Sequence, residues 1–240
     1  VYSPTLVESS IARMERLALK NVVDFMRVEP RITRNDRDLT LDVEFVIQRG
    51  PRVFVERIDI EGNTTTLDRV IRRQFDQAEG DPFNPRSIQQ AADRIRALGY
   101  FEDVDVNARE GSRPDQVVIE TDVEETTTGT VSVGASFSTN SGLGVSLGFS
   151  ERNFIGRGQQ LTAQILATAD NINYNLGFVE PAFLGRDVAL GLDFSFRETE
   201  SDNSLFDTAI GTFRPSLTFP TGENTRLNVY YNTSYEDMTD

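Results

Sequence analysis

Side chains that carry acid–base or nucleophilic chemistry are scarce in this sequence of 240 residues, which contains no histidine and no cysteine. Without histidine, a serine–histidine–aspartate triad cannot be assembled. Without imidazole or thiolate ligands, a typical zinc site is not expected either. The net charge of −14 argues against nucleic-acid binding, because the phosphate backbone is itself negative. We therefore expect a protein that is not an enzyme, with no catalytic residue, metal, cofactor or nucleic-acid partner.

The chemistry that the sequence does offer is the hydrogen bonding of extended backbone. From residue 126 to the end, apolar and polar residues alternate, which places them on opposite faces of a strand. In the segment 130–138 one face carries Val131, Val133, Ala135 and Phe137, and the other carries Ser132, Gly134, Ser136 and Ser138. Residues 126–150 contain no charged residue. This pattern predicts a sheet with lipid on one face and water on the other.

Seven segments follow this alternation, and each is close to the ~9–11 residues that cross a membrane at a tilt. They are 130–139, 142–152, 159–170, 172–182, 187–198, 207–219 and 225–236. A soluble β-sandwich is the alternative, but its outer face would normally carry Lys and Glu. Here the polar face is rich in Gly, Ser and Asn, and its charged members are Asp193, expected to be buried, and Arg197. We expect this face to line a barrel lumen, and seven strands to be part of a barrel of ~8 or more.

Residues 1–125 have a different composition, with 43 charged residues against 19 in residues 126–240, so we expect a domain boundary near Glu125. The predicted elements are a strand at 53–60, a helix from Thr66 to about Phe75, a helix from Pro85 to Gly99, and strands at 101–109 and 116–124. Thr66 is expected to cap the first helix, with Leu67, Val70 and Ile71 on one face. Asn84-Pro85 is a typical start for the second. The order is β-α-α-β-β.

Residues 1–48 repeat the second part of this unit. Ser3-Pro4 matches Asn84-Pro85 at an offset of 81, and the same offset relates the apolar residues Val7, Met14 and Leu17 to Ile88, Ile95 and Leu98. Strands are predicted at 23–32 and 39–47. The period predicts tandem domains, the first of them truncated at its N-terminus. The alternative is two unrelated helix–hairpin pieces that share a common capping pattern.

Several segments carry a resemblance to a known family. The sequence Ile60-Glu61-Gly62-Asn63 and the turn from Leu98 to Val104 resemble those of a POTRA domain. The segments from Glu151 to Gly158 and from Phe178 to Gly185 resemble connections in the barrel of the Omp85 family. The resemblance implies a partial POTRA domain at 1–49, a complete one at 52–125, and the N-terminal part of an outer-membrane barrel at 126–240. The expected fold class is α+β POTRA domains followed by an antiparallel transmembrane β-barrel portion.

The resemblance also implies a function and a location. Members of this family lie in the outer membrane of Gram-negative bacteria, with POTRA domains in the periplasm. The expected function is to capture unfolded barrel clients and fold them into the membrane by templating strands, without ATP. The implied partners are unfolded outer-membrane proteins, accessory outer-membrane lipoproteins, periplasmic chaperones and the lipid bilayer. A translocation-and-assembly module, a two-partner secretion translocator, and a barrel phospholipase or protease with active residues elsewhere remain alternatives.

Three sets of candidate functional residues follow. The strand 101–109 is expected to be the open edge of the POTRA sheet, which could take up a client strand through backbone hydrogen bonds; its named positions are Phe101, Val104 and Val106. By resemblance, the helix-end residues Arg72 and Glu79 are expected to bind an accessory lipoprotein. The first barrel strand is expected to form a lateral seam, with Thr130, Ser132, Gly134, Ser136 and Ser138 on its polar face.

Overall fold

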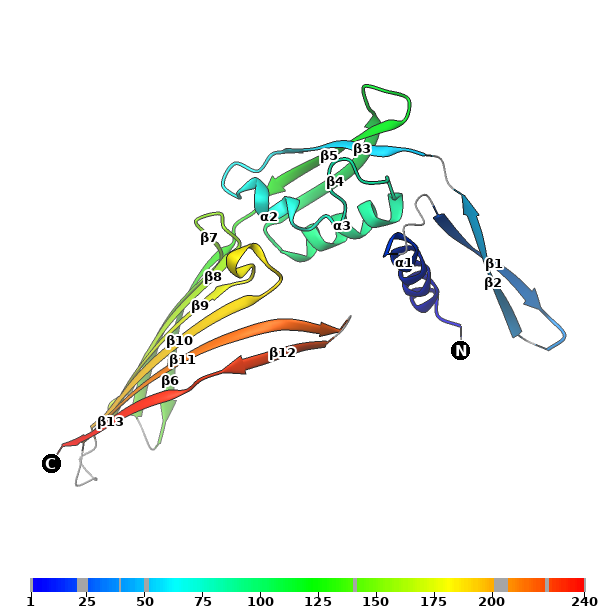
Figure 1. Ribbon diagram of the computed structural model, residues 1–240. Helices are drawn as coiled ribbons and strands as arrows, with labels where there is room; N and C mark the ends of the chain where they lie inside the picture. The colour runs from blue at the N-terminus through cyan, green and yellow to red at the C-terminus, as the bar shows by residue number, and fades with distance from the viewer. Residues whose placement is uncertain are drawn as a thin grey trace. The chain divides into compact units, whose positions relative to one another are not determined.

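The computed structural model describes residues 2–20, 26–38, 40–49, 52–139, 142–200, 207–222 and 225–239 of the chain. The chain divides into two compact units, and its elements can be followed by colour in Figure 1. Unit 1 comprises Val1–Asn63 and Ile71–Glu125, and unit 2 comprises Thr64–Val70 and Thr126–Asp240. Unit 1 thus ends at Glu125, where the charge density of the sequence falls. The sequence does not anticipate that residues 64–70 belong to unit 2.

Unit 1 is built on a sheet of the three strands β3 (Phe54–Glu61), β4 (Phe101–Glu110) and β5 (Gln116–Glu125). Their order in space is β3-β5-β4, with β5 parallel to β3 and antiparallel to β4. Helix α3 (Pro85–Ala97) lies along one face of this sheet (Figure 1). The core is apolar, and its fully buried residues include Val55, Ile71, Ile95, Val118 and Ile119. The predicted β-α-α-β-β order is confirmed.

The two helices of this unit differ in how well the sequence predicts them. Helix α3 begins as expected, because the Asn84 side chain accepts the Arg86 N–H at 3.0 Å and Pro85 takes the first helical position. Helix α2 (Asp68–Arg72) is shorter than predicted, and the expectation of a helix from Thr66 to Phe75 is wrong in length. At its start, Leu67 lies just outside the helix, its N–H donates to the Gly156 carbonyl, and its side chain is exposed. At its end, the Gln74 and Phe75 N–H groups donate to carbonyls three residues back, at Ile71 and Arg72, so the chain leaves the α-helical pattern after Arg72.

The N-terminal residues form helix α1 (Pro4–Lys20) and the antiparallel hairpin of β1 (Met26–Asn35) and β2 (Thr40–Arg49). Both α1 and α3 begin at the prolines that are 81 residues apart, but β1 and β4 begin only 75 residues apart. The match of apolar positions is weaker than expected, since Leu17 is exposed and the buried face of α1 includes Ile11 and Glu15. The predicted strand starts at positions 23 and 39 lie outside the described residues.

A buried carboxylate joins α1 to α3 within unit 1. The Glu15 side chain is only 5% exposed and forms an ion pair with Arg86 at 2.9 Å. The same carboxylate accepts the Val28 N–H and the Asn84 side-chain amide, both at 3.2 Å. Arg86 also pairs with the more exposed Glu8 at 3.0 Å. Because buried charge is costly unless it is paired and hydrogen-bonded, this network fixes α1 against both β1 and the start of α3.

Unit 2 is an eight-stranded antiparallel sheet in which strands that are neighbours in sequence pair from β6 to β12, while β13 pairs with β11. Its strands are β6 (Gly129–Ser138), β7 (Gly142–Phe154), β8 (Gln159–Ala167), β9 (Asn171–Glu180), β10 (Ala189–Thr199), β11 (Asp207–Gly222), β12 (Thr225–Tyr230) and β13 (Thr233–Thr239). The short 3-10 helix η1 (Phe183–Gly185) connects β9 to β10. The alternating segments of the sequence are therefore strands, and Figure 1 shows them curving together. Among the described residues, no helix has the length and apolar character that a membrane span requires.

The predicted seventh strand, 225–236, is divided into β12 and β13, which both pair with β11. The pairing register does not change across the division, because Ser216 pairs with Tyr230 and Phe213 pairs with Thr233. The interruption lies opposite Pro215, which has no N–H to donate to the ladder. The Tyr231 N–H still donates to the Pro215 carbonyl at 3.0 Å. The two pieces are one extended segment with a missing hydrogen bond.

We predict that Glu15→Ala destabilises the contact between α1, β1 and α3 by about 1–3 kcal/mol, because buried donors lose their acceptor. Hydrogen exchange of the Val28 amide measures this loss directly. Glu8→Ala is the matched control: it removes the exposed partner of the same arginine and should cost less than about 1 kcal/mol. Equal effects of the two variants would contradict a special role for the buried carboxylate.

Candidate functional site

The outer edge of β3 is occupied by the chain itself. The Val55 N–H donates to the Asp81 carbonyl at 2.9 Å, and the Gly80 N–H donates to the Val55 carbonyl at 2.7 Å. Phe54 forms an isolated antiparallel bridge with Pro82. Glu56 accepts the Ser112 N–H from the turn between β4 and β5, which holds the pKa of Glu56 below its ordinary value. This edge of the sheet is therefore covered along its first half.

Arg72 and Glu79 cover the next part of the β3 edge. The Ile58 N–H donates to Glu79 Oε1 at 3.3 Å, and Arg72 Nη2 donates to the Ile58 carbonyl at 3.1 Å. The two side chains also form an ion pair at 3.2 Å, with 40% and 51% of their surfaces exposed. The structure thus brings together the two residues that the sequence singled out. Their contact with the β3 backbone is a second role that local sequence cannot reveal.

Strand β4 is the other edge of the sheet, as expected. The Gly111 N–H donates to the Gln116 carbonyl at 2.9 Å, which fixes the direction of the backbone groups along β4. The backbone N–H and carbonyl groups of its odd-numbered residues point toward β5, and those of its even-numbered residues point outward, away from the sheet. At Val104 the outward groups are already engaged, because the carbonyl accepts Arg96 Nη2 at 2.7 Å and the N–H donates to Asp103 Oδ1 at 2.9 Å. The next outward positions are Val106 and Ala108.

The side chains of the predicted client-binding positions do not all lie at this edge. Phe101 and Val104 are buried, and Phe101 packs edge-on against Tyr100 with ring centroids 6.2 Å apart. Val106 is half-buried. Any strand that pairs with β4 would therefore meet its backbone rather than the side chains of Phe101 and Val104. Such pairing depends little on the sequence of the added strand.

Strand β6 ends the sheet of unit 2, and among the described residues it pairs with β7 alone. Its apolar face is open, with Val131 at 75% and Phe137 at 77% exposure. Other strands continue this apolar face, with Leu143, Leu147, Leu176, Phe194, Leu227 and Val229 also exposed. Contiguous exposed apolar surface of this kind marks a protein or membrane contact.

The opposite face of β6 fits β7 through small residues. Serine and glycine face each other in three successive pairs: Ser132 with Gly148, Gly134 with Ser146, and Ser136 with Gly144. A Cβ on any of these glycines would lie 2.5 to 2.7 Å from the partner serine Oγ. The pairing makes a low, polar surface, with Thr130 and Ser138 opposite Ser150 and Gly142 at its ends.

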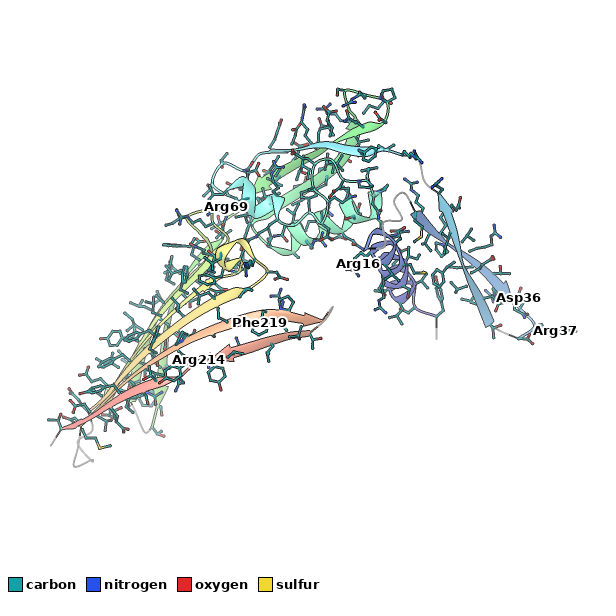
Figure 2. The ribbon with its side chains drawn as sticks, in the orientation of Figure 1. Arg16, Asp36, Arg37, Arg69, Arg214 and Phe219 are labelled. Atoms are coloured by element: carbon teal, nitrogen blue, oxygen red, sulfur yellow. The ribbon has the colours of Figure 1, made fainter. Side chains whose placement is uncertain are left out.

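The polar face farther along the sheet carries a few charged side chains. Arg214 of β11, labelled in Figure 2, lies 3.5 Å from Asp193 on the neighbouring β10. Arg197 Nε donates to Asn173 Oδ1 at 2.7 Å. The expectation that Asp193 is buried is wrong, since 53% of its side chain is exposed. Among the described residues, no group of acidic side chains is arranged to hold a metal ion.

Comparison with known proteins matches both parts of the chain. The POTRA family, described as surface antigen variable number repeat, matches residues 53–126, and the Omp85 superfamily domain matches residues 153–240. The outer membrane protein assembly factor BamA of Neisseria meningitidis is 28% identical over 200 residues, covering 81% of this chain and 25% of that protein. The chain belongs to the Omp85 superfamily.

Solved structures agree with this fold. BamA from Haemophilus ducreyi lacking POTRA domains 1-3 has a TM-score of 0.68 at 24% identity, with 100% of this chain and 46% of that chain covered. CdiB from Acinetobacter baumannii has a TM-score of 0.58 at 12% identity, with 100% and 47% covered. The chain thus spans about a quarter of the curated relative and less than half of each structure. The expected POTRA domain, barrel-like sheet and outer-membrane family are confirmed.

In this Omp85 protein, the serine–glycine pairing of β6 with β7 is the feature that sequence reasoning missed. The small residues were visible in both strands, but their mutual register was not. A usable signal exists, because every second position of 142–150 and of 132–138 is either serine or glycine. Reading the two segments as an antiparallel hairpin would have placed each serine opposite a glycine.

We predict that Gly148→Ala loosens the β6–β7 pair by about 1 kcal/mol, because the new Cβ meets Ser132 Oγ. Ser132→Gly in the same protein should restore the pairing. Gly211→Ala is the control, since its new Cβ would lie 3.8 Å from the Phe196 ring, which is an ordinary van der Waals distance. Hydrogen exchange of the β6 amides measures all three. A Gly148→Ala effect that Ser132→Gly does not relieve would show that the serine contact is not its cause.

Proposed function

We propose that this protein is an outer-membrane protein assembly factor that captures unfolded barrel clients and folds them into the membrane without ATP. The observation that carries the proposal is the pair of strand edges, β4 in the POTRA sheet and β6 at the end of the larger sheet. Its support from comparison is that the Neisseria relative is named as an outer membrane protein assembly factor. We propose no enzymatic role, no cofactor and no nucleic-acid partner.

The proposed mechanism uses backbone hydrogen bonds at both edges. An extended client segment would add to β4 from Val106 onwards, where the outward N–H and carbonyl groups lie past the part that Arg96 covers. Strand β6 would act as a lateral seam that templates the first client strand, with Thr130, Ser132, Gly134, Ser136 and Ser138 giving a surface free of bulky groups. The free energy would come from the client, through burial of its apolar face in lipid and completion of its hydrogen bonds.

The proposal extends to partners and domains. Arg72 and Glu79 would bind an accessory outer-membrane lipoprotein, and periplasmic chaperones would deliver clients. Residues 1–49 would be the final helix and hairpin of a preceding POTRA domain, 52–125 a complete POTRA domain, and 126–240 the N-terminal part of the barrel. The polar face of the sheet would line the lumen, and the exposed apolar face would contact lipid.

A related Omp85 transporter is the second candidate. The assembly factor is favoured because the BamA structure has the higher TM-score and twice the identity of the CdiB structure. Full reconstitution of client folding in lipid vesicles decides between assembly and transport, since only an assembly factor would accelerate the folding of unrelated barrel proteins.

We predict that Ala108→Pro lowers the capture of an unfolded barrel-protein segment several-fold, because proline removes an outward N–H from the β4 edge without breaking the ladder to β5. Fluorescence polarisation of a labelled client segment measures the affinity. Ala108→Val is the matched control, since it keeps the N–H. Equal affinity of the proline and valine variants would argue against client pairing at this edge.

For the lipoprotein surface, we predict that Glu79→Lys weakens capture of the accessory lipoprotein about tenfold or more, because the charge is reversed beside Arg72. Glu79→Gln separates charge from structure: its side-chain oxygen can still accept the Ile58 N–H. Co-purification with the lipoprotein measures both variants. Unchanged binding by the lysine variant would remove the assignment. An equal loss in both variants would locate the effect in the negative charge of Glu79, which both variants lack, because the glutamine variant keeps the hydrogen bond to Ile58.

A further inference from the structure

Residues 64–70 form part of unit 2, although they lie in sequence between β3 and α3 of unit 1. The chain therefore passes between the two units three times, at 63–64, 70–71 and 125–126. Within unit 2, the partner of this segment is the end of β7 together with the turn that leads to β8, residues 151–158. We call residues 64–70 the clasp segment and residues 151–158 the β7–β8 turn.

The β7–β8 turn has a fixed and unusual backbone. Ile155, Gly156 and Gly158 all have positive φ, at 53°, 66° and 68°. Asn153 closes the turn with two acceptors. Its side-chain Oδ1 accepts the Gly158 N–H at 2.8 Å, and its backbone carbonyl accepts the Gly156 N–H at 2.9 Å. Left-handed conformation at a branched residue such as Ile155 is costly. It persists here because these hydrogen bonds determine the path of the chain.

The clasp segment binds this turn through buried polar groups. Asn153 Nδ2 donates to Thr66 Oγ1 at 2.8 Å, and the Leu67 N–H donates to the Gly156 carbonyl at 2.8 Å. Thr66 is 2% exposed and Asn153 is 7% exposed. A Cβ at Gly156 would overlap the Thr65 carbonyl, so only glycine allows this approach. Buried hydrogen bonds with matched partners are costly to break, because both groups would lose their partners away from water.

The same network reaches Thr128, the residue immediately before β6. Glu151 Oε1 accepts the Asn153 N–H at 2.8 Å and also accepts the hydroxyl of Thr128, immediately before β6 begins at Gly129. The Arg152 N–H donates to the Thr128 carbonyl at 3.3 Å. A continuous path of hydrogen bonds therefore runs from Thr66 through Asn153 and Glu151 to Thr128.

We propose that the clasp segment is a conformational latch that fixes the beginning of β6. With Thr66 bound to Asn153, the turn holds Glu151 in place and Glu151 holds Thr128, so the first residues of β6 stay paired with β7. Release of Thr66 loosens that end of β6 while the strands from β8 onward keep their pairing. The latch is defined by contacts alone; its consequence for client templating rests on the proposed function of β6 as a seam.

The test is hydrogen exchange in the full-length protein, reconstituted in lipid nanodiscs. Thr66→Val removes the hydroxyl with little change in shape, and Thr66→Ser keeps a hydroxyl as the matched control. The latch predicts about tenfold faster exchange at Leu67 and at residues 129–132 in the valine variant, with little change in the serine variant and none in β10. Faster exchange at Leu67 alone, or equally in every strand, would overturn the coupling.

A double-mutant cycle gives a second, independent measurement. Asn153→Ala removes the partner of Thr66 and also the closure of the turn, so its effect at residues 129–132 is expected to exceed that of Thr66→Val. If the two residues act through one bond, the double variant exchanges no faster than Asn153→Ala alone. Fully additive effects would overturn the latch.

Client folding in vesicles is measured on the same variants. Faster β6 exchange with an unchanged folding rate would leave the latch standing and count against β6 as the templating seam. A change in folding rate without a change in β6 exchange would overturn the latch, because the variant would then act on client folding without loosening β6. The two ideas therefore fail separately.

Discussion

The edge of a β-sheet is the constraint on which the rest of this structure depends. Each edge strand presents a row of backbone donors and acceptors that must pair with something, or the sheet becomes a template for another chain. Unit 1 resolves one edge internally, since the segment 79–82 and Arg72 occupy β3. Among the residues that the structure describes, the hydrogen bonds that cover the outer side of β4 are those at Val104, so the outward groups of Val106 and Ala108 remain open. A strand that pairs with these open groups would bind through its backbone, so the pairing would depend little on the sequence of the client.

In the larger sheet, the edge strand is β6. Strand β6 is held to β7 by ten residue pairs and by close serine–glycine contacts, and its start is held by Glu151. On its other side, no described strand pairs with β6, which is the edge strand of the sheet. A strand with small side chains on one face offers little steric hindrance to a new neighbour, but it also gains little from side-chain packing. Its order therefore depends on the hydrogen bonds at its ends more than that of a strand embedded among bulky residues.

Features set by local spacing are the ones that could be predicted from sequence. The start of α3 follows from Asn84 and Pro85, and the strands of unit 2 follow from strict alternation, because both signals lie within a few residues. Features set by distant partners could not be predicted. Leu67 donates its N–H to Gly156, which is about 90 residues away, and Glu15 is buried because Asn84 and Arg86 meet it from a segment about 70 residues away. Side-chain burial at the β4 edge likewise depends on packing against the helix, so Phe101 and Val104 were named as edge residues although they face the core.

The two glycine motifs that marked the family resemblance have a common physical purpose. Gly62 precedes the clasp segment, and a Cβ there would overlap the Val123 carbonyl of β5 within unit 1. Gly156 meets the clasp segment in unit 2, where a Cβ would overlap the Thr65 carbonyl. Backbone therefore approaches backbone closely at Gly62 in unit 1 and at Gly156 in unit 2, and each approach leaves no room for a Cβ. A substitution at Gly156 would have to displace the Thr65 carbonyl rather than a flexible side chain, so under the proposed latch its effect would reach Thr66 and the start of β6.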